Sequence, residues 1–197
     1  MNDNFSPRVK NVVNTGKLEA IRMKHSVVGT EHLLLGILKE TDGSAFEVLA
    51  ALHANIPTLQ RKTESLANSI NSYSDTAASQ LEKSIPLTLQ AENAMKATVL
   101  EQKSFKNDQI KTAHLLLCIL RNNSDPTTKL LNQEKINYEN VRQQFEMINN
   151  EKKQDERTFM SSYAYEDDDE DEKSDILSPS TPQKNNSNQK TGSPRQA

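Results

Sequence analysis

A thirteen-residue motif that occurs twice is the strongest constraint on how this chain folds. Residues 28–40 read VGTEHLLLGILKE, and residues 110–122 read IKTAHLLLCILRN. Seven of the thirteen positions are identical, and the offset between the copies is 82 residues, as from His32 to His114. An internal repeat of this kind indicates two copies of one supersecondary unit, because a single copy is too small to bury its apolar face.

The register of the repeat extends beyond the motif on both sides. Phe5 falls opposite Leu87, and Leu49 falls opposite Leu131. After Leu131 we expect the second copy to be shorter by about two residues. The alignment predicts two repeat units, residues 5–66 and residues 87–148.

Each copy carries the signals of four helices, with apolar residues at helical spacing and no sustained alternation that would indicate a strand. Small polar residues that favour helix N-caps precede each predicted helix. We therefore predict an all-α fold: an eight-helix bundle of two tandem four-helix repeats with pseudo-twofold symmetry. The expected caps are Ser6, Thr30, Ser44 and Asn55 in the first copy, and Thr88, Thr112, Asp125 and Asn137 in the second.

The charge distribution separates a domain from a tail. The chain has a formal net charge of -3, yet residues 151–175 contain eleven acids against four bases. We predict a globular domain over residues 1–148, followed by a disordered acidic and polar linker over residues 149–197. The acidic run from Glu166 to Glu172 is interpreted as solvated linker. Two weaker alternatives are a segment that deters acidic partners and a weak metal site.

Composition excludes several classes of function. There is no Trp and aromatic residues make up 5% of the chain, which argues against a nucleic-acid binder that stacks bases on aromatic rings. The longest apolar run, Leu33–Leu35, is far too short to cross a membrane, and no signal peptide is evident. We expect a cytoplasmic protein that binds neither nucleic acid nor membrane.

Three stretches of the first copy resemble the Clp N-terminal repeat: FSPRVKNV at residues 5–12, GTEHLLLGIL at residues 29–38, and Asp42-Gly43 before a short helix. The tandem spacing is similar to that of the N-domain of ClpC-type ATPases, and the resemblance covers about residues 4–148. It implies a domain that docks adaptor proteins and substrates and delivers them to an ATP-driven unfoldase ring coupled to a protease. Some bacterial members bind phosphorylated arginine as a degradation mark.

The sequence lacks the motif of an ATPase motor. No stretch matches G-x-x-x-x-G-K-[ST], and no nucleophile–base pair stands out, so we expect no enzymatic activity and no cofactor in this chain. The resemblance implies that the ATPase modules belong to a parent AAA+ unfoldase. We expect this chain to be monomeric when separated from them. The alternative is a free-standing regulatory protein that uses the repeats to dock on an unfoldase or its adaptors.

The resemblance assigns a candidate phosphoarginine and substrate site to the first repeat. Glu31 is similar to the family's glutamate that meets the guanidinium, with Thr30, Ser6 and Arg8 as supporting residues. A carboxylate can accept two parallel hydrogen bonds from a guanidinium, and a helix N-terminus can bind the phosphate. In the second repeat, Thr112 and Thr88 retain hydroxyl groups, but Ala113 replaces Glu31 and Lys111 replaces Gly29. We therefore expect one competent site rather than two.

The histidines and the cysteine have structural interpretations. His25, His32, His53 and His114 do not show the spacing of a metal site, and we expect no bound metal. We predict that His32 and His114 form hydrogen bonds between helices. Cys118 matches Gly36 within a leucine-rich helix, which indicates a small buried residue rather than a nucleophile.

Overall fold

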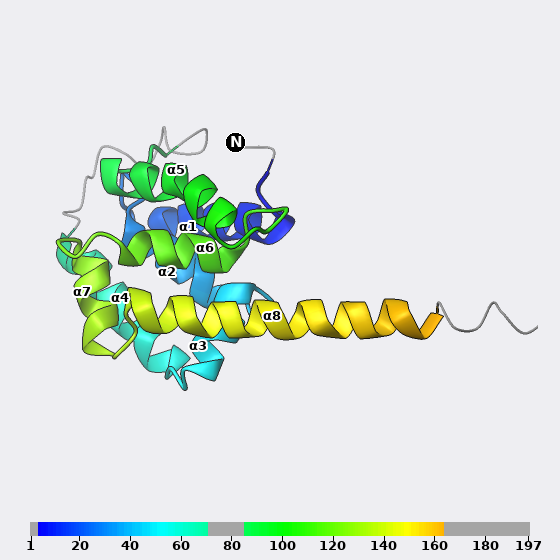
Figure 1. The fold of residues 1–197 in the computed structure, drawn as a ribbon. Coiled ribbons are helices and arrows are strands. Elements are labelled where there is room, and N and C mark those ends of the chain that lie inside the picture. Colours follow the sequence, from blue (N-terminus) through cyan, green and yellow to red (C-terminus); the bar gives the residue numbers. More distant parts are fainter. Residues whose placement is uncertain (1–3, 71–84, 164–197) are drawn as a thin grey trace, which may run out of the picture. The chain divides into compact units, whose positions relative to one another are not determined.

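The computed structural model describes residues 4–70 and 85–163, with side chains through residue 155. This part of the chain contains eight α-helices and no extended strand (Figure 1), which confirms the all-α prediction. The helices are α1 (Pro7–Arg22), α2 (Thr30–Lys39), α3 (Ser44–Ala51), α4 (Ile56–Ile70), α5 (Leu89–Ser104), α6 (Thr112–Leu120), α7 (Pro126–Gln133) and α8 (Tyr138–Tyr163).

The two repeats are related residue by residue. Within the described residues, the non-glycine positions with positive φ form two pairs at the repeat offset, Lys24 with Lys106 and His53 with Lys135. The offset of 82 residues also holds at the first residues of α3 and α7 and of α4 and α8. The expected shortening of the second copy after Leu131 is therefore wrong, because each turn has an exact counterpart.

Two isolated parallel bridges join the repeats to each other. Phe5 pairs with Ile110, and Val28 pairs with Leu87. These pairs exchange under the repeat offset, since Phe5 corresponds to Leu87 and Val28 to Ile110. Each repeat thus places the segment before its first helix beside the segment before the other repeat's second helix, as pseudo-twofold symmetry requires.

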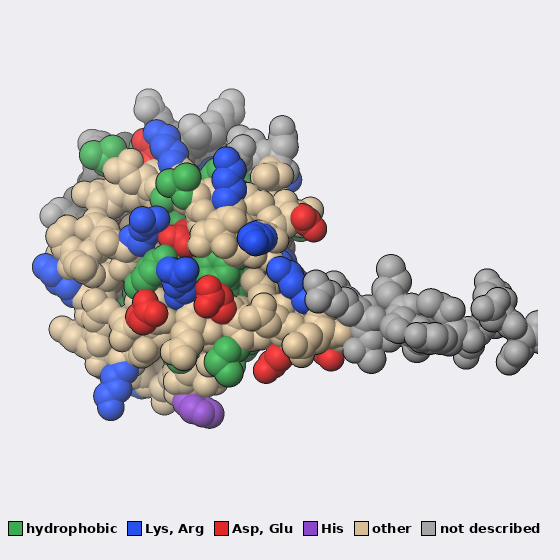
Figure 2. Space-filling view, viewed as in Figure 1, with side chains coloured by type: hydrophobic (Ala, Val, Ile, Leu, Met, Phe, Trp, Pro, Cys, Tyr) green, Lys and Arg blue, Asp and Glu red, His purple; other side chains and the backbone are tan. Residues whose placement is uncertain are grey.

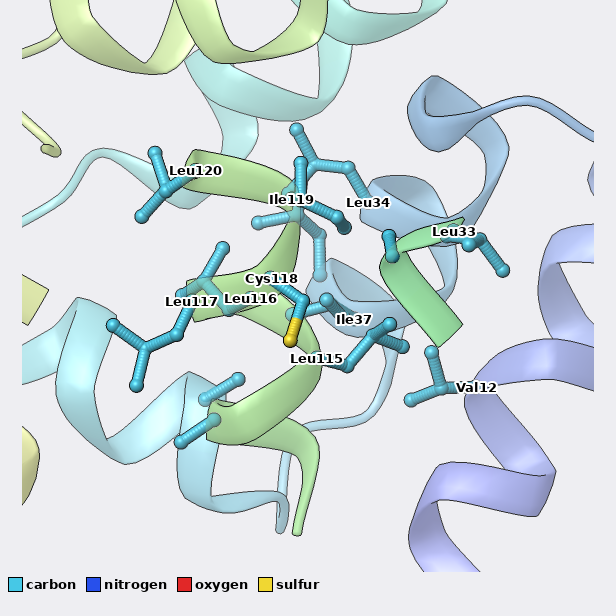
Figure 3. Packing of buried hydrophobic residues seen from close by; sticks show 14 of the residues in the cluster. Val12, Leu33, Leu34, Ile37, Leu115, Leu116, Leu117, Cys118, Ile119 and Leu120 are labelled. Atoms are coloured by element: carbon cyan, nitrogen blue, oxygen red, sulfur yellow. The ribbon is translucent and has the colours of Figure 1, made fainter. Parts of the chain in front are cut away.

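The core is built on α2 and α6, the two helices that carry the repeated motif. Every residue from Thr30 to Leu38 and from Thr112 to Leu120 is buried, so these helices are enclosed on all sides rather than along one stripe. Leucines and isoleucines of the two helices pack together with Val12 of α1 (Figure 3). Burial of large aliphatic side chains contributes roughly 1.5–3 kcal/mol for each side chain, so this double motif makes a large contribution to the stability of the fold.

The domain extends beyond the boundary expected at residue 148. Helix α8 continues to Tyr163, and the compact unit runs from Met1 to Arg157. Asn149 is only 5% exposed and donates a hydrogen bond to Asn107 (Nδ2 to Oδ1, 3.1 Å), so the helix still packs on the core where we expected the linker to begin. The remaining predicted linker, 164–197, and residues 71–84 between the two repeats lie outside the described residues. Among the helices described, none is long and apolar enough to cross a membrane.

Candidate functional site

Three of the expected helix caps are displaced by one residue. The N-caps of α2, α3 and α6 are Gly29, Gly43 and Lys111, whereas we predicted Thr30, Ser44 and Thr112. The Ser6, Thr88 and Asp125 caps are confirmed, since each side chain accepts a hydrogen bond from an amide of its own helix. The displacement leaves three hydroxyl groups available for contacts between the repeats.

Those hydroxyl groups connect helix N-termini across the pseudo-twofold axis. Thr30 Oγ1 of α2 donates to the Asp125 carboxylate that caps α7, at 3.0 Å. In the symmetric place, Thr112 Oγ1 of α6 accepts from the Ala45 amide of α3 at 2.9 Å, and Ser44 Oγ accepts from the Ala113 amide at 3.0 Å. The start of each central helix is therefore fixed by the other repeat.

Two surface clefts lie beside these paired N-termini. The Glu31 cleft has a volume of about 270 Å³ and is lined by Thr30, Glu31, Ile70, Thr88, Gln90, Asp125 and three neighbours. The Lys111 cleft has a volume of about 600 Å³, and its lining includes Ser6, Arg8, Asp42, Ser44, Lys111, Thr112 and Lys152. Six of the nine residues that line the Glu31 cleft have their counterpart at the repeat offset in the Lys111 cleft, so the two clefts are pseudo-symmetric.

The structure does not gather the four predicted site residues in one place. Glu31 and Thr30 line the Glu31 cleft, whereas Ser6 and Arg8 line the Lys111 cleft. The parallel bridges are the reason: the Ser6 amide donates to the Ile110 carbonyl at 3.0 Å, which holds Ser6 beside the second repeat's central helix.

Thr88 takes the place beside Glu31 that we had expected Ser6 to occupy. Its amide donates to the Val28 carbonyl at 2.9 Å, next to the start of α2. The exchange of segments between repeats could not be read from the sequence, because the motif match does not show which copy each N-terminal segment pairs with.

Glu31 is held in a nearly buried position at the wall of its cleft. The residue is 5% exposed, and its Oε1 lies 3.1 Å from His32 Nδ1. Its carboxylate lies over the backbone of Gly29, where a Cβ atom would come within 2.3 Å of both carboxylate oxygens. Glycine at position 29 is therefore a steric requirement of the Glu31 conformation.

The basic side chains of the Lys111 cleft have identified partners. Arg8 Nη1 lies 2.9 Å from Glu40 Oε1 and 3.4 Å from Asp42 Oδ2, and its hydrogen bond to Glu40 is the main factor that raises its pKa. Lys152 Nζ lies 2.7 Å from Glu47 Oε2. Lys111 Nζ donates to Asn149 Oδ1 at 3.2 Å. On the face shown in Figure 2, acidic and basic side chains alternate and no broad basic patch appears.

The repeat histidines stabilise the starts of α2 and α6 instead of joining separate helices. His32 Nδ1 accepts from the Gly29 amide at 3.0 Å, and His114 Nδ1 accepts from the Lys111 amide at 2.9 Å. The other ring nitrogen reaches the preceding loop, at His25 for His32 (2.8 Å) and at Asn107 for His114 (3.1 Å). Among the described residues, no three His, Cys, Asp or Glu side chains gather as metal ligands would.

Burial determines the ionisation of two core groups. It is the main reason that the pKa of His114 is lowered to about 4, with the nearby Lys111 charge as the second cause. Burial likewise raises the pKa of Cys118 to about 12. Cys118 is 4% exposed, which confirms the prediction of a small buried residue, and its thiol stays protonated at neutral pH.

Comparisons with known proteins agree with this architecture. Residues 4–157 match the family model described as the Clp repeat (R) N-terminal domain. The chain is 27% identical over 140 residues to the negative regulator of genetic competence ClpC/MecB of Bacillus subtilis. That alignment covers 71% of this chain and 16% of the relative.

Two further similarities concern a subunit of a protease and a solved complex. A probable ATP-dependent Clp protease ATP-binding subunit of Chlamydia pneumoniae is 31% identical over 147 residues, with 73% of this chain and 16% of the relative covered. The complex of the ClpV N-domain with a VipB peptide matches with a TM-score of 0.58 at 18% identity, covering 74% of this chain and 86% of the solved one. The chain thus spans about one sixth of the length of these curated relatives.

Proposed function

Because the chain belongs to the Clp repeat N-terminal domain family, we propose that it is the adaptor- and substrate-docking domain of a cytoplasmic Clp protein unfoldase. The proposal is supported by the relatives, which are a ClpC protein and a Clp protease ATP-binding subunit, and by the peptide complex of the ClpV N-domain. In this proposal the docking domain is monomeric and non-catalytic, and the ATPase modules of the parent unfoldase perform the unfolding.

The observation that carries the proposal is the Glu31 cleft. It is a concave site in which two nearly buried carboxylates, two threonine hydroxyl groups and the N-terminus of α5 come together, and Glu31 is the carboxylate that does not cap a helix. A carboxylate held by its surroundings is already oriented for two parallel hydrogen bonds to a planar guanidinium. The cleft therefore fits an arginine-like side chain, and we propose that arginine-phosphorylated substrates are among its ligands.

The phosphate of such a ligand would lie at the start of α5. This helix has 16 residues, and Thr88 Oγ1 already accepts from the Ala91 amide. The Leu89 and Gln90 amides of the same first turn have no partner within the helix ladder, and Gln90 lines the cleft. Amides at a helix N-terminus and the positive end of its dipole favour a phosphate group. Thr88 and Gln90 thus replace Ser6 and Arg8 in the proposed site.

Calorimetric titration of phosphoarginine into the full chain tests this proposal. We expect binding at one site per chain and weaker binding of plain arginine. Glu31→Gln should reduce the affinity at least about tenfold, because the charge-assisted pair to the guanidinium is lost. Glu64→Gln is the matched control, because it removes an acid of α4 that lines neither cleft.

Two outcomes would contradict the assignment. One is the absence of saturable phosphoarginine binding. The other is equal affinity of the wild-type chain and the Glu31→Gln variant, which would place the ligand elsewhere.

A further inference from the structure

We propose that the Lys111 cleft binds an acidic peptide segment of a partner protein, so that the two pseudo-symmetric clefts recognise ligands of opposite charge. The inference rests on the lining of this cleft and does not depend on phosphoarginine binding at Glu31. An acidic segment here means an extended stretch in which carboxylate side chains flank an apolar one.

The first argument is the replacement of neutral by basic residues at equivalent positions. Three cationic side chains line the Lys111 cleft, and each has a neutral counterpart at the repeat offset. The pairs are Arg8 with Gln90, Lys111 with Gly29, and Lys152 with Ile70. The cations come from the start of α1, the N-cap of α6 and the middle of α8, and they meet at the same concave surface.

The second argument is the balance of charge in each cleft. The lining of the Lys111 cleft contains three bases and the acids Asp42 and Glu47, a formal charge of +1. The lining of the Glu31 cleft contains Glu31 and Asp125 and no base, a formal charge of -2. The Glu31 cleft carries only acids and therefore repels an acidic ligand, whereas the Lys111 cleft has an excess of one positive charge. The two clefts therefore differ in the ligand charge that they favour.

The third argument is steric coupling between the two positions that distinguish the clefts. Glu31 can lie over position 29 only because Gly29 has no Cβ. In the second repeat Lys111 has a side chain at the equivalent position, and Ala113 removes the carboxylate that would collide with it. The two positions therefore change together: where the first repeat has glycine and a carboxylate, the second has an ammonium group and alanine.

The size and the walls of the cleft favour a peptide over a small ion. About 600 Å³ is far more than a single carboxylate fills, and Pro7, Phe145 and Ile148 give the cleft an apolar wall. Ser6 and Gln109 add hydrogen-bonding groups for a peptide backbone. The ion pairs of Arg8 and Lys152 are at the surface and therefore weak, so ligand carboxylates can replace the present partners.

Fluorescence anisotropy with the full 197-residue chain tests the proposal. The probe is a fluorescein-labelled, amidated peptide with the sequence Glu-Glu-Leu-Glu-Glu, and the matched peptide has Gln in place of every Glu. We expect the Glu peptide to bind at least about tenfold more tightly than the Gln peptide. Raising the salt concentration should reduce this difference, because the attraction is between charges near the surface.

Variants locate the binding. The double variant Lys111→Gly/Ala113→Glu installs the first-repeat pair and should reduce the affinity for the Glu peptide at least about tenfold. Lys152→Ile introduces the residue found at the equivalent position 70 and should also weaken binding. Position 152 is on the exposed side of α8, so this variant poses little risk to the fold. Lys96→Gln removes one charge from α5 outside both clefts and should leave the affinity unchanged.

The proposal is overturned if both peptides bind equally or neither binds. It is also overturned if Lys96→Gln weakens binding as much as Lys152→Ile does. If the double variant fails to fold, Lys152→Ile and Arg8→Gln decide the outcome, because both positions are exposed at the rim of the cleft.

Discussion

His32 and His114 show how single side chains organise both repeats. Each ring accepts a hydrogen bond from the amide of its own helix N-cap and reaches back to the loop before that helix. Both rings are fully buried, so these bonds have no competition from water. The histidine is therefore a structural link that holds the wall of each cleft in place.

The buried state of His114 predicts a dependence of stability on pH. Its pKa is lowered to about 4, chiefly by burial, so that the folded chain keeps it neutral while the unfolded chain protonates it near pH 6.5. The unfolded state then binds more protons between these values, and stability falls as the pH decreases through this range. From pH 7 to pH 5 the contribution is ~2 kcal/mol.

Urea unfolding at both pH values measures this contribution. His114→Gln should shrink the difference in unfolding free energy between pH 7 and pH 5. An unchanged difference would show that other groups cause the pH dependence.

Gly29 gives a second prediction at the residue scale. Gly29→Ala should weaken ligand binding at Glu31, because the new Cβ would collide with the Glu31 carboxylate and displace it. The fold should lose only ~0.5–1.5 kcal/mol, because the displaced atoms are the end of a flexible side chain that can change its rotamer. Adding Glu31→Ala removes the collision and should restore most of the stability. Thermal or urea unfolding of the two variants measures both effects, and a double variant no more stable than Gly29→Ala would refute this steric explanation.

At the scale of elements, the pairing of helix N-termini ties the two repeats together. Asp125 caps α7 through the Thr127 amide at 2.8 Å and also accepts from Thr30 of α2 at 3.0 Å. The carboxylate is 4% exposed and cannot replace a lost donor with bulk water. The contact between repeats is thus a buried polar contact in addition to the apolar core.

We predict that Thr30→Val lowers the unfolding free energy by ~2 kcal/mol, because it leaves a buried carboxylate short of one donor. Thr30→Ser keeps the hydroxyl group and serves as the control, with a much smaller effect. Chemical denaturation measures both variants; similar losses for Val and Ser would mean that the threonine methyl group, rather than the hydroxyl, stabilises the contact.

Most of the helical pattern could be predicted from the sequence, whereas the pairing of segments could not. Proline at the start of α1 and repeated leucines in α2 and α6 mark helices through local chemistry. The caps of α2 and α6 were misplaced by one residue. The N-caps are Gly29 and Lys111, whose own amides donate to the histidine three residues later, while the threonine hydroxyl groups contact the other repeat. Ser6 lines the Lys111 cleft and not the Glu31 cleft for a different reason, namely that the repeats exchange their N-terminal segments.

At the scale of the whole molecule, duplication creates two clefts with one backbone plan and different linings. The plan is fixed by the central helices and the two parallel bridges. The linings depend on a few positions outside the core, such as the half-buried Lys111 and the exposed Lys152, and these can differ between the repeats. Under our two proposals, this arrangement lets one small helical domain offer two docking sites of different specificity.

The most direct test of this account is a titration with both ligands. The full chain is saturated with the Glu-Glu-Leu-Glu-Glu peptide, and phosphoarginine is then titrated calorimetrically at physiological salt, where charges more than ~8 Å apart are largely screened. The account predicts one phosphoarginine site whose affinity is the same with and without the peptide, because the ligands occupy separate clefts. Displacement of the peptide by phosphoarginine would show that both share one cleft, and would contradict the account.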